Sequence, residues 1–62
     1  MTTMYLINFI SAHPEYENIV ILNEGNRTAR QATERLSNDH YHEQEKDWRI
    51  NTSLENNTLL IY

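Results

Sequence analysis

The sequence predicts a small α+β domain of β-β-α-β-β order, with one helix on one face of a mostly antiparallel sheet. Three observations lead to this prediction. Residues 4–10 and 19–22 are apolar runs of strand length. Residues 29–36 place their small and apolar side chains on one side of a helix. Residues 48–54 alternate between apolar and polar side chains, as a half-buried strand does.

The first two expected elements are strands. Residues 4–10, MYLINFI, are rich in β-branched and aromatic side chains, which are typical of strands. Residues 11–18 are polar and contain the single proline, so they predict a loop. Residues 19–22, IVIL, form an apolar run that is too short for a helix and is read as the second strand.

A helix of about three turns is expected to begin at Thr28. Thr28 and Gln31 have the spacing of a capping box, in which each side chain accepts a hydrogen bond from the other residue's backbone N–H. Asn26 is the competing N-cap. The helix is expected to end near Asp39, where the apolar pattern is lost. Its inner side would carry Ala29, Ala32, Thr33 and Leu36.

Two more strands are expected in the C-terminal part of the chain. The inner face of the strand over residues 48–54 would carry Trp48, Ile50, Thr52 and Leu54. Residues 55–57 predict a turn, because asparagine tolerates the left-handed backbone that tight hairpins require. Residues 58–62 then form the last strand.

The expected strand order across the sheet is 19–22, 4–10, 48–54 and 58–62. The alternative order, which stays open, places the strand over residues 48–54 beside that over residues 19–22. Residues 1–62 are expected to form one domain, because the chain is too short for more than one hydrophobic core.

The composition of the chain disfavours or excludes several classes of function. The net charge is −4, with nine acidic against five basic residues, which disfavours a general nucleic-acid binder because phosphate contacts need clustered cations. The chain has no cysteine, so disulfides, thiolate zinc sites and cysteine nucleophiles are excluded. The first apolar run lacks a basic leader and is too short to cross a bilayer, so a cytoplasmic protein without a membrane partner is expected.

Residues 38–48, NDHYHEQEKDW, are the part of the chain that most resembles a chemical site. In extended backbone His40 and His42 would point to the same side and could bind zinc together with nearby carboxylates. No further ligand has the spacing of a known site, and carboxylates in a solvated loop keep ordinary pKa values. We therefore expect a solvated connector, no metal, no cofactor and no catalytic residue. A His/carboxylate metal-binding protein remains an alternative.

The functional prediction rests on apolar side chains that the single expected helix cannot cover. One helix can cover only one face of the sheet, yet three of the expected strands are apolar on both faces. Contiguous exposed apolar patches mark interaction sites, so a second chain, identical or foreign, is expected to cover the remaining face. The alternative is that residues 11–18 and the connector fold over it. The best candidates for this self-association or partner surface are Leu6, Ile10, Val20, Leu22 and Leu60.

The helix offers a second, polar surface. Arg27, Arg30 and Arg35 are expected on its outer side, with Glu34 between them. A solvated face is the ordinary interpretation of such a pattern. The alternatives are a nucleic-acid-associated regulator that uses these arginines and, from the acids elsewhere in the chain, a mimic of nucleic acid.

In size, acidity, lack of cysteine and strand–helix–strand order, the chain resembles the small acidic proteins that bacteriophages and mobile elements encode to block one host protein. Those include inhibitors of host polymerase and of restriction or CRISPR defence. The resemblance covers the whole chain but rests on no motif, so it transfers no functional residue. Together with the apolar surplus, it implies a non-enzymatic, homo-oligomeric protein-binding module that occludes a functional surface of its target.

Overall fold

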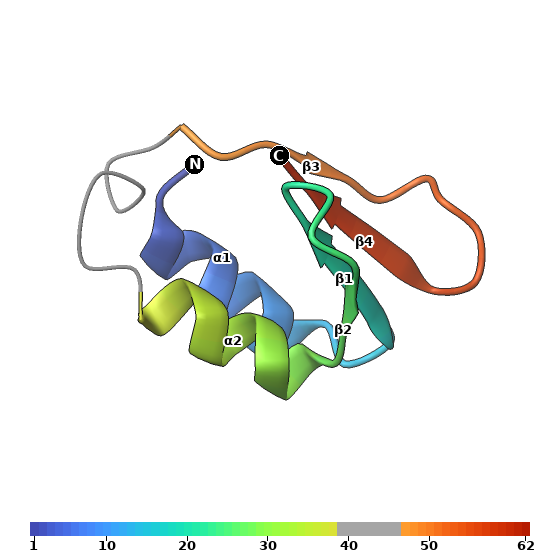
Figure 1. Ribbon diagram of the computed structural model, residues 1–62, viewed down its shortest axis with the longest axis horizontal. Helices are drawn as coiled ribbons and strands as arrows, with labels where there is room; N and C mark the ends of the chain where they lie inside the picture. Colours follow the sequence, from blue (N-terminus) through green and yellow to red (C-terminus); the bar gives the residue numbers. More distant parts are fainter. Residues whose placement is uncertain (39–46) are drawn as a thin grey trace.

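The computed structural model describes residues 1–38 and 47–62, which form two helices and a four-stranded sheet (Figure 1). The predicted α+β class is confirmed. Both helices lie on the same side of the sheet. In chain order the elements are α1 (Thr3–Ala12), β1 (Asn18–Ile21), β2 (Asn26–Arg27), α2 (Ala29–Ser37), β3 (Ile50–Asn51) and β4 (Thr58–Ile61).

The N-terminal element is a helix, so the prediction of a strand over residues 4–10 is wrong, and the described residues form two helices rather than one. Thr2 is the N-cap of α1, and its hydroxyl accepts a hydrogen bond from the backbone N–H of Tyr5 at 3.1 Å. Thr3, Leu6 and Ile10 are the buried residues of α1. Their spacing of three and four makes a helical stripe, and burial of that stripe outweighs the weak strand preference of isoleucine and the aromatic residues.

The strands lie in the order β2–β1–β4–β3, which differs from the predicted order. The central pair β1–β4 is parallel, and it places β4 beside β1 where residues 4–10 were expected. The two outer pairs, β1–β2 and β3–β4, are antiparallel. Because two of the three pairings are antiparallel, the sheet is mixed but still mostly antiparallel, as predicted.

The strand expected over residues 48–54 is reduced in the structure to the two residues of β3, Ile50–Asn51. The side-chain oxygen of Asn51 accepts hydrogen bonds from the backbone N–H of Ser53 at 2.9 Å and from its hydroxyl at 2.7 Å. Such a local turn competes with strand pairing. Thr52 and Leu54, which were expected to face the core, are therefore exposed.

Two tight turns use left-handed backbone. The predicted turn at residues 55–57 is confirmed, with φ of 61° at Asn56 and 53° at Asn57. A second turn follows β1, where Leu22 and Asn23 have φ of 49° and 60°. Leucine is uncommon in this region because its Cβ crowds the backbone. The strand predicted over 19–22 thus ends before Leu22.

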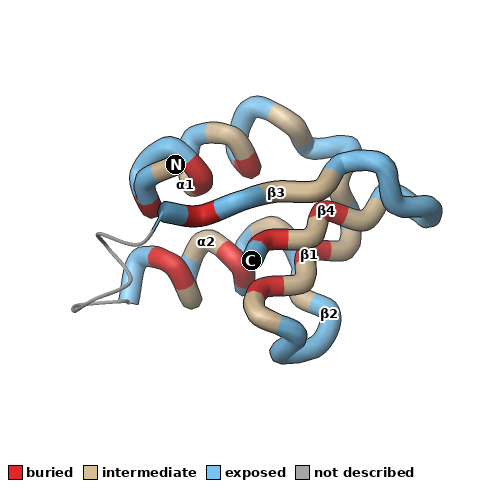
Figure 2. The backbone as a smooth tube through the Cα atoms, turned by 90° about the horizontal axis from the view of Figure 1, so that it is seen from above, coloured by how far each residue is buried: buried red, intermediate tan, exposed pale blue. Residues whose placement is uncertain are grey.

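The core lies between the helices and the sheet (Figure 2). The indole N–H of Trp48, a residue that is 1% exposed, donates to the Thr3 hydroxyl at 3.0 Å, and its backbone N–H donates to the carbonyl of Met1 at 2.9 Å. Trp48 therefore ties the chain before β3 to the start of α1. The buried apolar residues are Leu6, Ile10, Ile19, Ile21, Ala32, Leu36, Trp48, Leu59 and Ile61.

The helix predicted to begin at Thr28 is confirmed as α2, and its capping box is present. The Thr28 hydroxyl accepts from the backbone N–H of Gln31 at 3.1 Å, and the Gln31 side-chain oxygen accepts from the N–H of Thr28 at 3.0 Å. Thr28 is therefore the N-cap, rather than Asn26, which lies in β2.

Replacing Thr28 with alanine is expected to lower the free energy of unfolding by about 1 kcal/mol, because the N–H of Gln31 loses its acceptor. In a domain of this size the melting temperature should fall by roughly 4–8 °C. Circular dichroism during heating measures the change. Thr28→Ser keeps the hydroxyl and is the matched control. Equal melting temperatures for the alanine and serine variants would show that the capping box contributes nothing.

Candidate functional site

The sheet face turned away from the helices is the first candidate surface. Buried and half-buried residues alternate along β1 and β4, so Val20 and Leu60 point away from the core. Strand register makes these two side chains direct neighbours and places Asn26 beside Val20 and Asn51 beside Leu60. The uncharged row Asn26–Val20–Leu60–Asn51 therefore crosses all four strands. We call this row the open sheet face.

Of the five residues predicted to face outward, the structure brings only Val20 and Leu60 together on the open sheet face. Leu6 is 0% exposed and Ile10 is 2% exposed, so the prediction that they face outward is wrong. The reason is the helical period of α1, which turns both side chains into the core. Leu22 lies in the turn after β1 and packs against the core.

The three arginines predicted to share one outer surface are separated in the structure. The guanidinium of Arg35 donates two hydrogen bonds to the carboxylate of Glu24, at 3.1 and 3.2 Å, and Arg27 lies 3.1 Å from the same carboxylate. Of the three, only Arg30 has a highly exposed side chain, at 90%, and it forms an ion pair with Glu34 at 3.7 Å. The prediction is wrong for Arg27 and Arg35, because the β1–β2 turn brings Glu24 onto them.

The hydrogen bond from Arg35 is the main cause that lowers the pKa of Glu24 below its ordinary value of 4.5, and the charges of Arg35 and Arg27 add to it. A carboxyl whose pKa is lower in the folded chain stabilises the fold above about pH 4.5, and this contribution is lost as the pH falls through the folded pKa. Because Glu24 is partly exposed, the contribution is expected to stay below about 1 kcal/mol.

Glu24→Gln should therefore lower the free energy of unfolding at about pH 7 and have a smaller effect at about pH 3, because the stabilisation from the carboxylate is lost as the pH falls through the folded pKa of Glu24. Urea unfolding at both pH values measures the difference. Glu55→Gln removes an exposed acid from the turn before β4 and is the control, with no comparable effect at either pH. A Glu24→Gln effect of the same size at both pH values would contradict the ionic origin of the stabilisation.

The outer side of α1 is a second candidate surface. None of its ten residues is charged, and Met4 and Tyr5 are 64% and 55% exposed. The ring of Phe9 stacks on His13, with centroids 4.2 Å apart, and lies 6.5 Å from the ring of Tyr5. Tyr16, just beyond the helix, stacks on Phe9 at 6.1 Å. We call these five residues the α1 surface.

Two acids follow the C-terminal end of the α1 surface. Glu15 and Glu17 are exposed, and Nδ1 of His13 lies 3.1 Å from a carboxylate oxygen of Glu15. A hydrogen bond from its own backbone N–H, followed by the bond to His13, lowers the pKa of Glu15 below its ordinary value. The end of this surface therefore carries negative charge at neutral pH.

A strand over residues 4–10, as predicted from the sequence, does not produce the α1 surface. A signal was present, because Tyr5, Phe9 and His13 are spaced by four residues, the separation at which side chains meet on a helix. Thr2 also stands three residues before Tyr5, as a helix cap does.

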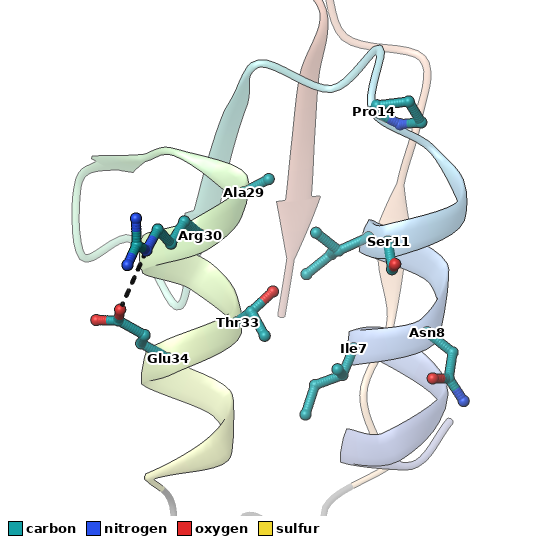
Figure 3. Close-up of a pocket in the computed structure, with 9 residues that line it drawn as sticks. Ile7, Asn8, Ser11, Pro14, Ala29, Arg30, Thr33 and Glu34 are labelled. Atoms are coloured by element: carbon teal, nitrogen blue, oxygen red, sulfur yellow. Dashed lines mark ion pairs between the residues drawn. The ribbon is translucent and has the colours of Figure 1, made fainter.

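An open groove of about 640 Å³ lies between α1 and α2 (Figure 3). Ile7 of α1 faces Ala29 and Thr33 of α2 across it, and the ion pair between Arg30 and Glu34 lies on its α2 side. Its other lining residues are Asn8, Ile10, Ser11 and Pro14.

Within residues 1–38 and 47–62, no three histidine, aspartate or glutamate side chains come together where they could hold a metal ion. The histidines of the sequence-predicted alternative, His40 and His42, lie outside the described residues, so that alternative is untested.

Comparison with protein families, with curated proteins and with solved structures finds no match to this chain. In the described part of the chain, neither helix has the length and apolar character needed to cross a membrane. The fold and its surfaces define a two-layer α+β domain with apolar side chains exposed on both layers.

Proposed function

We propose that the chain is a non-enzymatic protein-binding module that self-associates through the open sheet face and acts by covering a functional surface of a partner protein. One observation carries the proposal: Val20 and Leu60 lie side by side on a parallel strand pair whose helices are both on the other side. Sheets made only of parallel strands are covered on both faces, and the central strand pair of this mixed sheet is parallel. A second layer over this face would complete that arrangement.

The composition of the open sheet face supports a second copy of the chain as that layer. The row Asn26–Val20–Leu60–Asn51 has no charge, so two chains of net charge −4 need not bring acids together there. Under two-fold symmetry the same patch faces itself. The apolar pair would then meet an apolar pair, and asparagine amides, which both donate and accept hydrogen bonds, would meet amides.

The size of the patch predicts weak association. Covering two half-buried apolar side chains on each copy contributes on the order of 3–6 kcal/mol. Association costs at least about 4 kcal/mol in lost freedom of motion. The asparagine hydrogen bonds must therefore contribute, and we expect a dissociation constant in the high-micromolar range.

Occlusion of a partner protein is the part of the proposal that comes from the resemblance to small phage-encoded inhibitors, and a cytoplasmic location belongs to the same proposal. The nucleic-acid alternative is weakened, because Arg27 and Arg35, two of the three arginines that it would use, form ion pairs with Glu24. No structural observation favours it as a second candidate.

Sedimentation equilibrium from low micromolar to millimolar concentration tests self-association. We expect the wild-type mass to rise from monomer to dimer. Leu60→Glu should remain a monomer with an unchanged circular dichroism spectrum, because its charge lies on the open sheet face. Met4→Glu adds the same charge on the helical layer and should associate as the wild type does. A wild-type chain that stays monomeric at millimolar concentration, or a Leu60→Glu variant that still dimerises, would refute self-association through this face.

A further inference from the structure

We infer that the α1 surface binds a foreign protein segment that is apolar and carries an arginine or lysine at one end. The inference rests on the proposed function only in taking the chain to be a protein-binding module. It does not require self-association, because the α1 surface and the open sheet face belong to opposite layers of the domain.

The apolar character of α1 shows that this surface lacks a cover. A surface helix normally turns polar and charged side chains to water, but α1 exposes large apolar side chains beside its exposed polar residues Asn8 and Ser11. In α1 the inner stripe with Leu6 and Ile10 is buried in the core, whereas Met4 and Tyr5 on other sides are more than half exposed. The helix has no charged residue that would favour contact with water.

The C-terminal end of the α1 surface is suited to a cation. The end of a helix carries partial negative charge, and α1 has no basic residue in its last turn to offset it. Glu15 and Glu17 add two carboxylates next to this end. Tyr16, which stands between these two acids in the sequence, stacks on Phe9 of α1, and aromatic faces attract guanidinium and ammonium groups.

A second copy of the chain does not fit this surface. Its own α1 would bring the same acids and no cation. Arg30, with its highly exposed side chain, lies on α2 and is already 3.7 Å from the carboxylate of Glu34 in its own chain. An anionic membrane is also unsuitable, because Glu15 and Glu17 would face its phosphates.

The length of α1 sets the spacing in the partner. Met4 and Ala12 are separated by eight residues of helix, or about 12 Å. A partner that spans α1 from Met4 to its C-terminal end should therefore hold its apolar anchor and its cation roughly two helical turns apart. An amphipathic basic helix is a suitable probe, because such helices bind apolar surfaces with their apolar face.

A synthetic amphipathic peptide of leucine and lysine, and its counterpart with glutamate in place of lysine, provide the test. We expect the amide NMR signals of residues 4–17 to shift when the lysine peptide is added. The lysine peptide should bind at least about fivefold more tightly than the glutamate peptide. Shifts confined to α2 or the sheet, or equal affinities for the two peptides, would overturn the inference.

Paired variants separate a specific site from general attraction to an acidic protein. Glu15→Gln/Glu17→Gln should weaken binding of the lysine peptide by about fivefold, whereas Glu34→Gln/Glu55→Gln, with the same change in net charge, should leave it unchanged. Tyr5→Ala should also weaken it while circular dichroism shows a folded chain. Equal losses for both charge pairs would overturn the inference, as would binding of phosphatidylcholine vesicles in competition with the peptide.

Leu60→Glu keeps this test independent of self-association. The variant should bind the lysine peptide with wild-type affinity, because its substitution lies on the open sheet face. Loss of peptide binding in this variant would overturn the inference even if the wild-type chain dimerises. A monomeric wild type that binds the peptide at α1 would support the inference and refute only self-association.

Discussion

Leu6→Glu is expected to leave the domain unfolded at room temperature. Leu6 is 0% exposed and lies among the buried apolar side chains of the core. An unpaired buried charge costs several kcal/mol, and a core this small supplies only about 3–5 kcal/mol in total. The far-ultraviolet circular dichroism spectrum should therefore be that of an unfolded chain.

Asn8→Glu is the matched control for this variant. It places the same charge in the same helix, at an exposed position, and should remain folded. The comparison also separates a helix from a strand in this part of the chain. If residues 4–10 formed a strand with Leu6 on its outer face, Leu6→Glu would stay folded, and that result would contradict the structure.

Trp48→Ala is expected to have the second large effect. Truncating a buried aromatic side chain to alanine costs about 3–5 kcal/mol, and Trp48 is 1% exposed. The variant also removes the indole donor that binds the Thr3 hydroxyl. The link between the start of α1 and the chain before β3 is thereby weakened, so most molecules should be unfolded without a stabilising osmolyte.

Thr3→Val separates the contribution of the hydrogen bond to stability from that of side-chain packing. It leaves the indole N–H of Trp48 buried without the Thr3 acceptor, which should cost about 1–3 kcal/mol. Thr3→Ser keeps the acceptor and should cost less. Urea unfolding followed by circular dichroism measures all three variants. If Thr3→Val and Trp48→Ala proved equally mild, Trp48 would not anchor the core.

Local signals explain which elements could be predicted from the sequence. The start of α2 follows from Thr28 and Gln31, which are three residues apart and act within one turn. The turn at residues 55–57 follows from the backbone preference of asparagine alone. For residues 4–10 two local signals conflict, because side-chain type favours a strand and spacing fits a helix. Contacts with distant residues such as Trp48 decide between them.

The strand order depends on long-range pairing, which no local pattern reveals. The parallel neighbour of β1 is β4, about forty residues further along the chain. Alternation separates Val20 from Ile19 and Ile21, and Leu60 from Leu59 and Ile61, but both sets are apolar, so it is the structure that fixes Val20 and Leu60 as the outward ones. The error for the arginines has a similar origin, since a helical wheel of α2 contains no information about Glu24 in the preceding turn.

Isotope-filtered NOE spectroscopy can show whether a second copy of the chain covers the open sheet face. Labelled and unlabelled chains would be mixed at a concentration where sedimentation shows a dimer, so that only contacts between two chains are observed. We predict intermolecular NOEs from the methyl groups of Val20 and Leu60. Intermolecular NOEs that arise from Met4 and Tyr5 instead, with none from Val20 or Leu60, would contradict the account.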